Sequence, residues 1–363
     1  MTSPFRVALA HFGDLDIGPV HHRNLLATLG DDEAVWGVSE SELMRGGLSP
    51  TMAAKFVAWR NAHNPQALAD DVATRGIDVV GVDDDRYPTL LKAIHDPPYV
   101  LFYRGTLPPH DAMTLGVVGS RKATDYGLRV AHDMSRDLAS RGIVIVSGLA
   151  WGIDEAAHRA TLDAGGVTIA VLASGLDGQD APRKDALARA IVDAGGCVMS
   201  EFPPTMPPLT HHFPIRNRVI AGLSKATLVV EAAEQSGSLI TARAALNENR
   251  ELFAVPGPIT SPTSVGTNRL CRDGAHVATC ADDILSVLGV TDDRRGAVTP
   301  PMRTGSPASP EAAAIYAVLT MEPLHIDDIC RAVGLPTPLV GSTLTVMEIE
   351  GWARHIGGSR YIR

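Results

Sequence analysis

The chain has 363 residues, of which 45% are hydrophobic and 20% charged, a composition typical of a globular protein with two or three domains. Its 41 acidic and 32 basic residues give a net charge of −9, which excludes a protein that coats nucleic acid through bulk positive charge. A local basic groove is still compatible with this charge, because phosphates respond to charges within a Debye length. The four cysteines form no CxxC pair, and no apolar run is long enough to span a bilayer. We therefore expect a cytoplasmic protein with no disulfide framework, no metal, no cofactor and no membrane association.

Residues 1–75 are predicted to form a small helical domain of the helix–hairpin–helix or SAM-like kind. Glycine turns at 15–19 and 46–50 connect short apolar helices, and such turns can offer backbone N–H groups to DNA phosphates. Residues 1–80 carry 6 basic and 10 acidic residues, however, so a packing domain is favoured over one that contacts DNA.

Residues 76–290 alternate between short β-branched runs and helical stretches, which predicts an α/β fold with a parallel sheet and crossover helices. Most of these runs lack polar alternation, as expected for strands buried on both faces. We expect one enlarged Rossmann-like domain with strands at 115–118, 143–146, 168–172, 197–200, 227–230 and 251–255, and an additional strand at 99–103.

Residues 291–308 are polar and rich in proline and glycine, which indicates a linker. Residues 309–363 then show three helical stretches and a tight hairpin, the element order of a winged helix. A winged helix that reads DNA needs basic residues on its recognition helix. The third helix (337–350) has none, and 309–363 carries 4 basic and 6 acidic residues, so protein contact or domain packing is favoured.

Two strand–glycine–helix junctions are the most informative feature of the sequence. Gly119-Ser120-Arg121-Lys122 follows the strand at 115–118, and Gly148 follows the strand at 143–146. A glycine after a strand lets the backbone approach an anion, and the next helix supplies N–H donors. Since ligands bind at the carboxyl ends of such strands, both loops should line one crevice. Neither loop is a G-x-G-x-x-G or Walker motif, so we predict a phosphate site without dinucleotide specificity.

A second cluster contains Phe213, Arg216, Asn217 and Arg218 at the start of a predicted helix. An aromatic ring beside paired arginines can stack on a base while the guanidinium groups hold phosphates. The alternative is that one arginine pairs with an internal carboxylate such as Glu201 or Glu231, and we expect one arginine of each kind.

Two further loops follow strand ends. Gly237 and Ser238 open a helix after the strand at 227–230 and could bind an anion, although an ordinary serine N-cap explains them equally well. Asn268 lies in a loop region after the strand at 251–255. Asp154 and His158 are spaced i, i+4 but lack a third catalytic group, so we interpret Asp154 as an N-cap and His158 as a buried hydrogen-bonding residue.

Taken together, these motifs resemble the DNA-processing protein A family, DprA, also called Smf. The resemblance covers about 80–280 and rests on motifs that keep the family's order and spacing: Arg86-Tyr87-Pro88, Gly119-Ser120-Arg121-Lys122, Ser147-Gly148, Gly152-Ile153-Asp154, Ser174-Gly175-Leu176-Asp177, Ser200-Glu201, Phe213-Pro214, Arg216-Asn217-Arg218, Ser236-Gly237-Ser238, Pro256-Gly257 and Gly266-Thr267-Asn268. The chain departs from the family at Ala181-Pro182 and Asp185, where Tyr-Pro and then Asn are usual, although Arg183 and Lys184 keep basic charge nearby.

The resemblance implies a cytoplasmic protein that binds and protects single-stranded DNA and helps to load the RecA recombinase in natural transformation and recombination. It also implies a homodimer and no enzymatic activity. On this basis Gly119, Ser120 and Arg121 are expected to form the phosphate pocket, with Arg216, Asn217 and Arg218 beside it. Phe213 as a base-stacking group is our inference from the residues.

Two other functions were weighed. Related Rossmann-like domains act as nucleotide sensors or cleave nucleotide N-glycosides, but their Pro-Gly-Gly-x-Gly-Thr loop is replaced here by Pro256-Gly257-Pro258. A transcription regulator that uses the winged helix is disfavoured by the acidity of residues 309–363.

Overall fold

The computed structural model describes residues 2–11, 17–178, 182–290, 309–320, 324–350, 352–355 and 359–362, with the backbone alone described for 182–185, 349 and 354–355. It divides into two compact units, Met1–Val290 and Thr291–Arg363. In these described ranges no helix is both long enough and apolar enough to cross a membrane.

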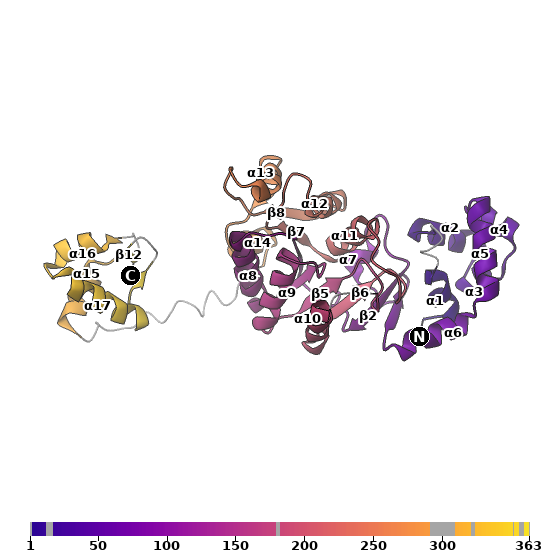
Figure 1. The fold of residues 1–363 in the computed structure, drawn as a ribbon, viewed down its shortest axis with the longest axis horizontal. Helices are drawn as coiled ribbons and strands as arrows, with labels where there is room; N and C mark the ends of the chain where they lie inside the picture. The colour runs from indigo at the N-terminus through magenta and orange to yellow at the C-terminus, as the bar shows by residue number, and fades with distance from the viewer. Residues whose placement is uncertain are drawn as a thin grey trace. The chain divides into compact units, whose positions relative to one another are not determined.

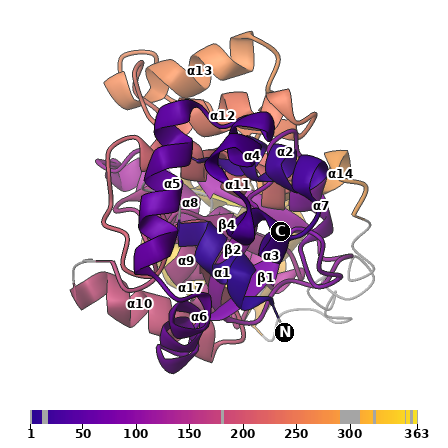
Figure 2. The ribbon, with the colours of Figure 1, turned by 90° about the vertical axis from the view of Figure 1, so that its right-hand side faces the viewer.

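The first unit begins with short helices that pack on one edge of a sheet (Figures 1 and 2). Several of them start at a proline, which has no N–H to lose at that position, and Ser49 and Asn64 cap two of them through side-chain oxygens. Their core contains Leu25, Leu43 and Phe56 and continues into side chains of strand β2. The helices are α1 (Pro4–Ala10), α2 (Pro19–Leu29), α3 (Asp32–Gly37), α4 (Glu40–Arg45), α5 (Pro50–Ala62) and α6 (Pro65–Thr74).

A nine-stranded sheet forms the centre of the first unit, in the order β1-β2-β6-β5-β4-β3-β7-β8-β9. All seven predicted strands are present within a residue or two, whereas the short edge strands β1 and β9 were not predicted. The strands are β1 (Asp78–Gly81), β2 (Val100–Gly105), β3 (Thr114–Val118), β4 (Val144–Ser147), β5 (Thr168–Val171), β6 (Cys197–Ser200), β7 (Ala226–Val229), β8 (Glu251–Ala254) and β9 (His276–Val277).

Seven neighbouring strands, from β6 to β9 in the sheet order, are parallel, and β1 and β2 extend the sheet in antiparallel fashion. The chain moves outward from β3 through β4, β5 and β6, and then returns to the other side of β3 as β7. This reversal makes the carboxyl end of β3 the topological switch point, where α/β sheets open a crevice. The predicted α/β fold class is confirmed.

Helices cover both faces of the sheet (Figure 1). Residues of α8, α9 and α14 pack on one face around Leu115 and Phe253, and residues of α7, α11 and α12 pack on the other around Val118 and Met199. Helix α10 covers β5 and β6. These helices are α7 (Thr89–Lys92), α8 (Asp125–Ser140), α9 (Ile153–Asp163), α10 (Pro182–Asp193), α11 (His212–Leu223), α12 (Ser238–Asn247), α13 (Val265–Arg272) and α14 (Ala281–Val287).

The second unit has the predicted winged-helix order. It consists of α15 (Pro310–Val318), β10 (Leu324–His325), α16 (Ile326–Val333), α17 (Thr337–Ile349), β11 (Arg354–His355) and β12 (Arg360–Ile362). The three strands pair in the order β10-β12-β11, and Ile315, Ile329 and Leu344 join the three helices in one core. The predicted hairpin turn at 356–358 and the predicted linker at 291–308 lie outside the described residues.

Candidate nucleic-acid interface

A cavity of about 630 Å³ opens at the topological switch point, between the carboxyl ends of β3 and β7 and the first turn of α11. Loops that are far apart in the sequence meet here, as the two strand–glycine–helix junctions predicted. Nine predicted site residues line this cavity, which we call the crevice: Gly119, Ser120, Arg121, Lys122, Phe213, Arg216, Asn217, Gly237 and Ser238. A smaller cavity of about 210 Å³ adjoins it and is lined by Arg121, Gly148, Phe213 and Arg216 among others.

The loop after β3 is held close to the start of α9 by two glycines. A Cβ on Gly119 would lie 2.5 Å from Ile153 Cγ1, and a Cβ on Gly152 would lie 2.3 Å from the carbonyl oxygen of Ser120. Gly152 also has φ +81°, a conformation that disfavours other residues. Glycine at these two positions therefore lets the loop after β3 pack directly against the start of α9.

Arg121 and Lys122 are the exposed cations of the crevice. Neither side chain forms an ion pair with any residue that the structure describes. The Arg121 guanidinium instead lies over the Phe213 ring, with Cζ 4.5 Å from the ring centroid, a cation–π contact. One face of the ring is thus covered, so a base that stacks on Phe213 in this arrangement has only the opposite face.

Arg216 also lines the crevice, but its side chain is 96% buried. Its Nη1 donates hydrogen bonds to the carbonyl oxygens of Gly148 (2.6 Å) and Val171 (2.5 Å), and its Nε donates to Asn217 Oδ1 (3.1 Å). Burial lowers the pKa of Arg216 to about 10, so it stays charged at neutral pH, and the nearby Asp154 carboxylate favours that charge. These hydrogen bonds of the Arg216 guanidinium therefore connect α11 to the carboxyl ends of β4 and β5.

Gly148 is a structural residue rather than an open anion site. Its N–H donates to Asp154 Oδ2 at 3.1 Å, and its carbonyl oxygen accepts from Arg216. A Cβ at this position would lie 2.4 Å from Arg216 Nη1, so only glycine leaves room for the guanidinium. We predicted Gly148 as a phosphate-binding residue, and these contacts give that prediction no support, because the N–H of Gly148 already has a partner.

Arg218 points away from the crevice and forms an ion pair with Glu201. It also donates to the carbonyl oxygen of Asp96. The alternative that one arginine pairs with Glu201 is therefore confirmed, whereas Glu231 instead accepts hydrogen bonds from Thr124 at the start of α8. Burial raises the pKa of Glu201 to about 7 although Arg218 opposes the shift. We expected one arginine to hold a phosphate and the other to pair with an internal carboxylate. Instead, both guanidinium groups are bonded to other parts of the protein, because α11 turns them toward the sheet.

Polar residues at the start of α12 hold one side of the crevice in place. Asn217 Nδ2 donates to the carbonyl oxygen of Gly237 at 3.3 Å, and the hydroxyls of Ser236 and Ser238 are 2.8 Å apart. Gly237 occupies the N-cap position of α12 and offers no side-chain cap, but Ser236 Oγ accepts a hydrogen bond from the Ser238 N–H at 3.4 Å, so a serine does satisfy a backbone donor at this helix start. Asn268, which we expected in a loop, lies instead in helix α13 and outside the crevice lining. Its Oδ1 accepts a hydrogen bond from the Gly257 N–H, and its Nδ2 donates to the Gly257 carbonyl oxygen.

Asp154 and His158 both lie on α9, where Asp154 lines the crevice and His158 does not. Asp154 is the second residue of α9, after the N-cap Gly152, so its interpretation as an N-cap is wrong by two positions. His158 is fully buried and bonds Thr168 Oγ1 at 2.7 Å, as expected, and burial lowers its pKa to about 3. A proton-transfer role for His158 has no support, because the ring is neutral and out of reach of a ligand.

Sequence reasoning missed several residues of the crevice, among them Gln235 and Thr263. Gln235 is exposed in the loop after β7, and a single glutamine in a loop gives no signal in a sequence. The side chain of Arg183, which we expected at the rim, lies outside the described residues. Among the residues that are described, no group of three histidine, cysteine or acidic side chains could hold a metal ion.

Known proteins share this architecture. The profile of DNA recombination-mediator protein A matches residues 78–289, which is more than half of the chain. The chain belongs to this family. The DprA winged helix domain also matches, over residues 299–359. Protein Smf of Escherichia coli is 40% identical over 291 residues, which cover 78% of this family member and 77% of that protein. DNA processing protein DprA of Bacillus subtilis is 40% identical over 59% of this chain and 72% of its own length.

Two solved structures extend the likeness to three dimensions. DNA processing protein A from Streptococcus pneumoniae matches with a TM-score of 0.67 and 33% identity, over 77% of this recombination-mediator chain and 97% of that structure. DNA processing protein A from Helicobacter pylori, whose structure concerns a single-stranded DNA binding mode, matches with a TM-score of 0.52 and 27% identity. That match covers 58% of this chain and 95% of the other.

Proposed function

We propose that this protein binds single-stranded DNA through the crevice at the carboxyl ends of β3 and β7. The observation that carries the proposal is the convergence of Arg121 and Lys122, exposed and without acidic partners among the described residues, with Phe213 and the Gly237–Ser238 loop in one cavity. Exposed cations can hold phosphates, and an aromatic ring can stack on a base regardless of its identity. The Helicobacter pylori relative, described as binding single-stranded DNA, supports the same ligand.

Binding of this kind should show strong salt dependence and little sequence preference. The test is fluorescence anisotropy with a labelled oligothymidine and its duplex form at two salt concentrations. Tight, salt-sensitive binding of the single strand with much weaker duplex binding is expected. Absence of single-strand binding at low salt would contradict the proposal.

Arg121→Glu is the decisive variant, because it places a negative charge where the phosphate is expected. We expect it to remove most of the binding, a loss of about 100-fold or more, without a change in the melting temperature. Arg136→Glu is a matched control, since Arg136 lies in α8 outside the lining of the crevice. If Arg121→Glu binds as tightly as the parent, the assignment of the phosphate pocket is wrong.

The bound strand is proposed to serve recombination: the protein protects exposed DNA and helps to load the RecA recombinase, including during natural transformation. Membership of a recombination-mediator family supports this role. The test is RecA assembly on oligothymidine coated with single-strand-binding protein, with Arg121→Glu as the inactive comparison. We further propose that the protein is a cytoplasmic homodimer. Light scattering of the full chain tests the dimer.

A further inference from the structure

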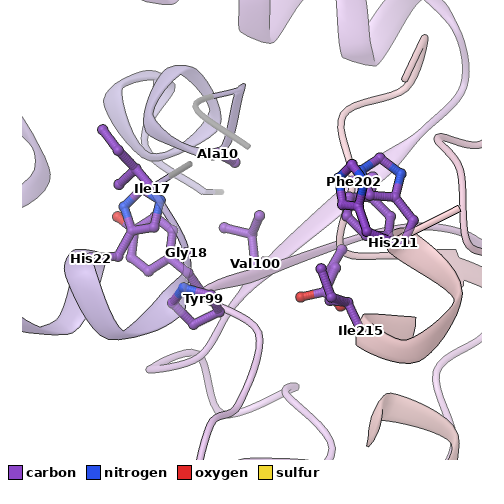
Figure 3. A pocket seen from close by; sticks show the side chains of 12 residues that line it. Ala10, Ile17, Gly18, His22, Tyr99, Val100, Phe202, His211 and Ile215 are labelled. Carbon is purple, nitrogen blue, oxygen red and sulfur yellow. The ribbon is translucent and has the colours of Figure 1, made fainter. Parts of the chain in front are cut away.

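A second cavity, of about 260 Å³, lies between the N-terminal helices and the sheet (Figure 3). Figure 3 shows His22 and Tyr99 on one side of it, Phe202 and His211 on the other, and Val100 between them. Its residues come from five segments: the end of α1, the start of α2, the start of β2, the segment after β6 and the first turn of α11. None of its lining residues was predicted as a binding residue from the sequence.

The walls of this second cavity are flat rings. The His22 and Tyr99 rings are stacked with centroids 4.4 Å apart and an interplanar angle of 3°, and the Phe202 and His212 rings are stacked at 4.0 Å and 21°. Burial lowers the pKa of His22 to about 3, so its ring is neutral. Neutral aromatic walls are suited to another flat ring, which can stack on them or meet their edges.

Glu201 adds a polar group to these walls. Its side chain is only 9% exposed, and Arg218 is bonded to Oε2. The other oxygen, Oε1, is buried without a hydrogen-bond partner among the residues that the structure describes. A buried acceptor is normally satisfied, and Glu201 lines the cavity, so an N–H donor on a bound molecule would complete the carboxylate.

The second cavity and the crevice share the first turn of α11. His212 and Ile215 line the second cavity, whereas Phe213, Pro214 and Arg216 line the crevice. The two cavities therefore lie against the same turn of α11.

We infer that the second cavity binds one nucleobase of the single strand held in the crevice, with Glu201 accepting an N–H from the edge of that base. The inference rests on the proposed function. Each of the four bases carries an N–H donor on its pairing edge, so this contact is compatible with binding that shows little sequence preference. Stacking and the hydrogen bond together would add affinity that the phosphate pocket alone does not supply.

The test compares an oligothymidine with the same strand built entirely from N3-methylthymidine, which keeps the ring but removes the N–H donor. The wild-type chain should bind the methylated strand about tenfold more weakly, because the hydrogen bond to Glu201 is lost. Equal affinities for the two strands would overturn the inference while leaving single-strand binding intact. If the wild type binds neither strand, both the inference and the proposed function fail.

Two variants locate the effect. Ile215→Trp narrows the second cavity without altering Glu201, and Glu201→Leu removes the acceptor itself. Both should bind the two strands with nearly equal affinity, whereas Leu246→Trp, on an exposed face of α12 away from both cavities, should keep the tenfold difference. Thermal melting checks that each variant is folded, and an unchanged tenfold difference in both folded variants would overturn the inference.

Discussion

The loop after β3 and the first turns of α11 each carry two cations, yet they use them in opposite ways. Arg121 and Lys122 are exposed and have no acidic partner among the described residues, whereas Arg216 and Arg218 are nearly buried and bonded to carbonyl oxygens or to Glu201. The difference teaches that a pair of basic residues beside a predicted ligand site does not show by itself which cations are free. Free charge binds a ligand, and buried charge must be compensated by the protein. The following experiments test this division, from the largest expected effect to the smallest.

Arg216→Met tests the buried side of the comparison. Removal of the guanidinium leaves the Asp154 carboxylate and two carbonyl groups without their partner, so the free energy of unfolding should fall by about 3–5 kcal/mol. The control, Arg121→Met, removes an exposed cation and should change stability by no more than about 0.5 kcal/mol. Urea unfolding measures both, and equal losses would contradict the division into structural and ligand-binding arginines.

His158 tests the same buried region through pH. Burial and the neighbouring Arg216 charge lower its pKa from 6.5 to about 3, so the unfolded chain binds the proton more readily than the folded one. The contribution of His158 to the free energy of unfolding is fully present above pH 6.5 and is lost as the pH falls toward 3. The loss amounts to about 3 kcal/mol at pH 4. His158→Gln cannot take up this proton, so its stability should fall less between pH 7 and pH 4. A parallel decline in parent and variant would show that His158 is not the titrating group.

Gly152→Ala tests how closely the two junctions must pack. Gly152 and Gly142 share φ +81°, but a Cβ meets the Ser120 carbonyl oxygen at 2.3 Å only at position 152, and nothing within 4 Å at position 142. Gly142→Ala should therefore cost only the backbone strain, about 1–2 kcal/mol, whereas Gly152→Ala should cost about 2–3 kcal/mol and also weaken single-strand binding. Unfolding and anisotropy measure the two effects. If both variants behave alike, the contact between the loops does not shape the crevice.

Lys122→Gln is expected to have the smallest effect. Lys122 is exposed, and its ammonium group is a point charge on a flexible stem, so it should contribute one screened phosphate contact. The affinity for oligothymidine should fall about threefold at moderate salt, and the slope of log K against log salt should become shallower by about 0.7. Lys225→Gln, on the turn before β7 and outside the crevice lining, is the control. An unchanged slope in Lys122→Gln would remove this residue from the interface.

Much of the architecture was predictable because it depends on patterns that are local in the sequence. Buried strands such as β3 and β7 appear as short β-branched runs, and the glycines that follow them mark the loops of the crevice. Strands β1 and β9 escaped prediction because they are short edge strands with exposed residues. The second cavity was not predicted for a different reason: its residues come from five separate segments, none with a recognisable motif.

The sequence by itself determined the fold class, the winged helix and the segments that meet at the switch point, since periodicity and turn residues act over a few positions. Only the tertiary structure decided which charges are exposed in the crevice. Arg216 and Arg218 are two residues apart, and each is bonded to a partner that is distant in the sequence. Arg216 donates to the Gly148 carbonyl oxygen, and Arg218 forms an ion pair with Glu201. Burial and pairing arise when separate segments pack together, and that packing left Arg121 exposed over Phe213.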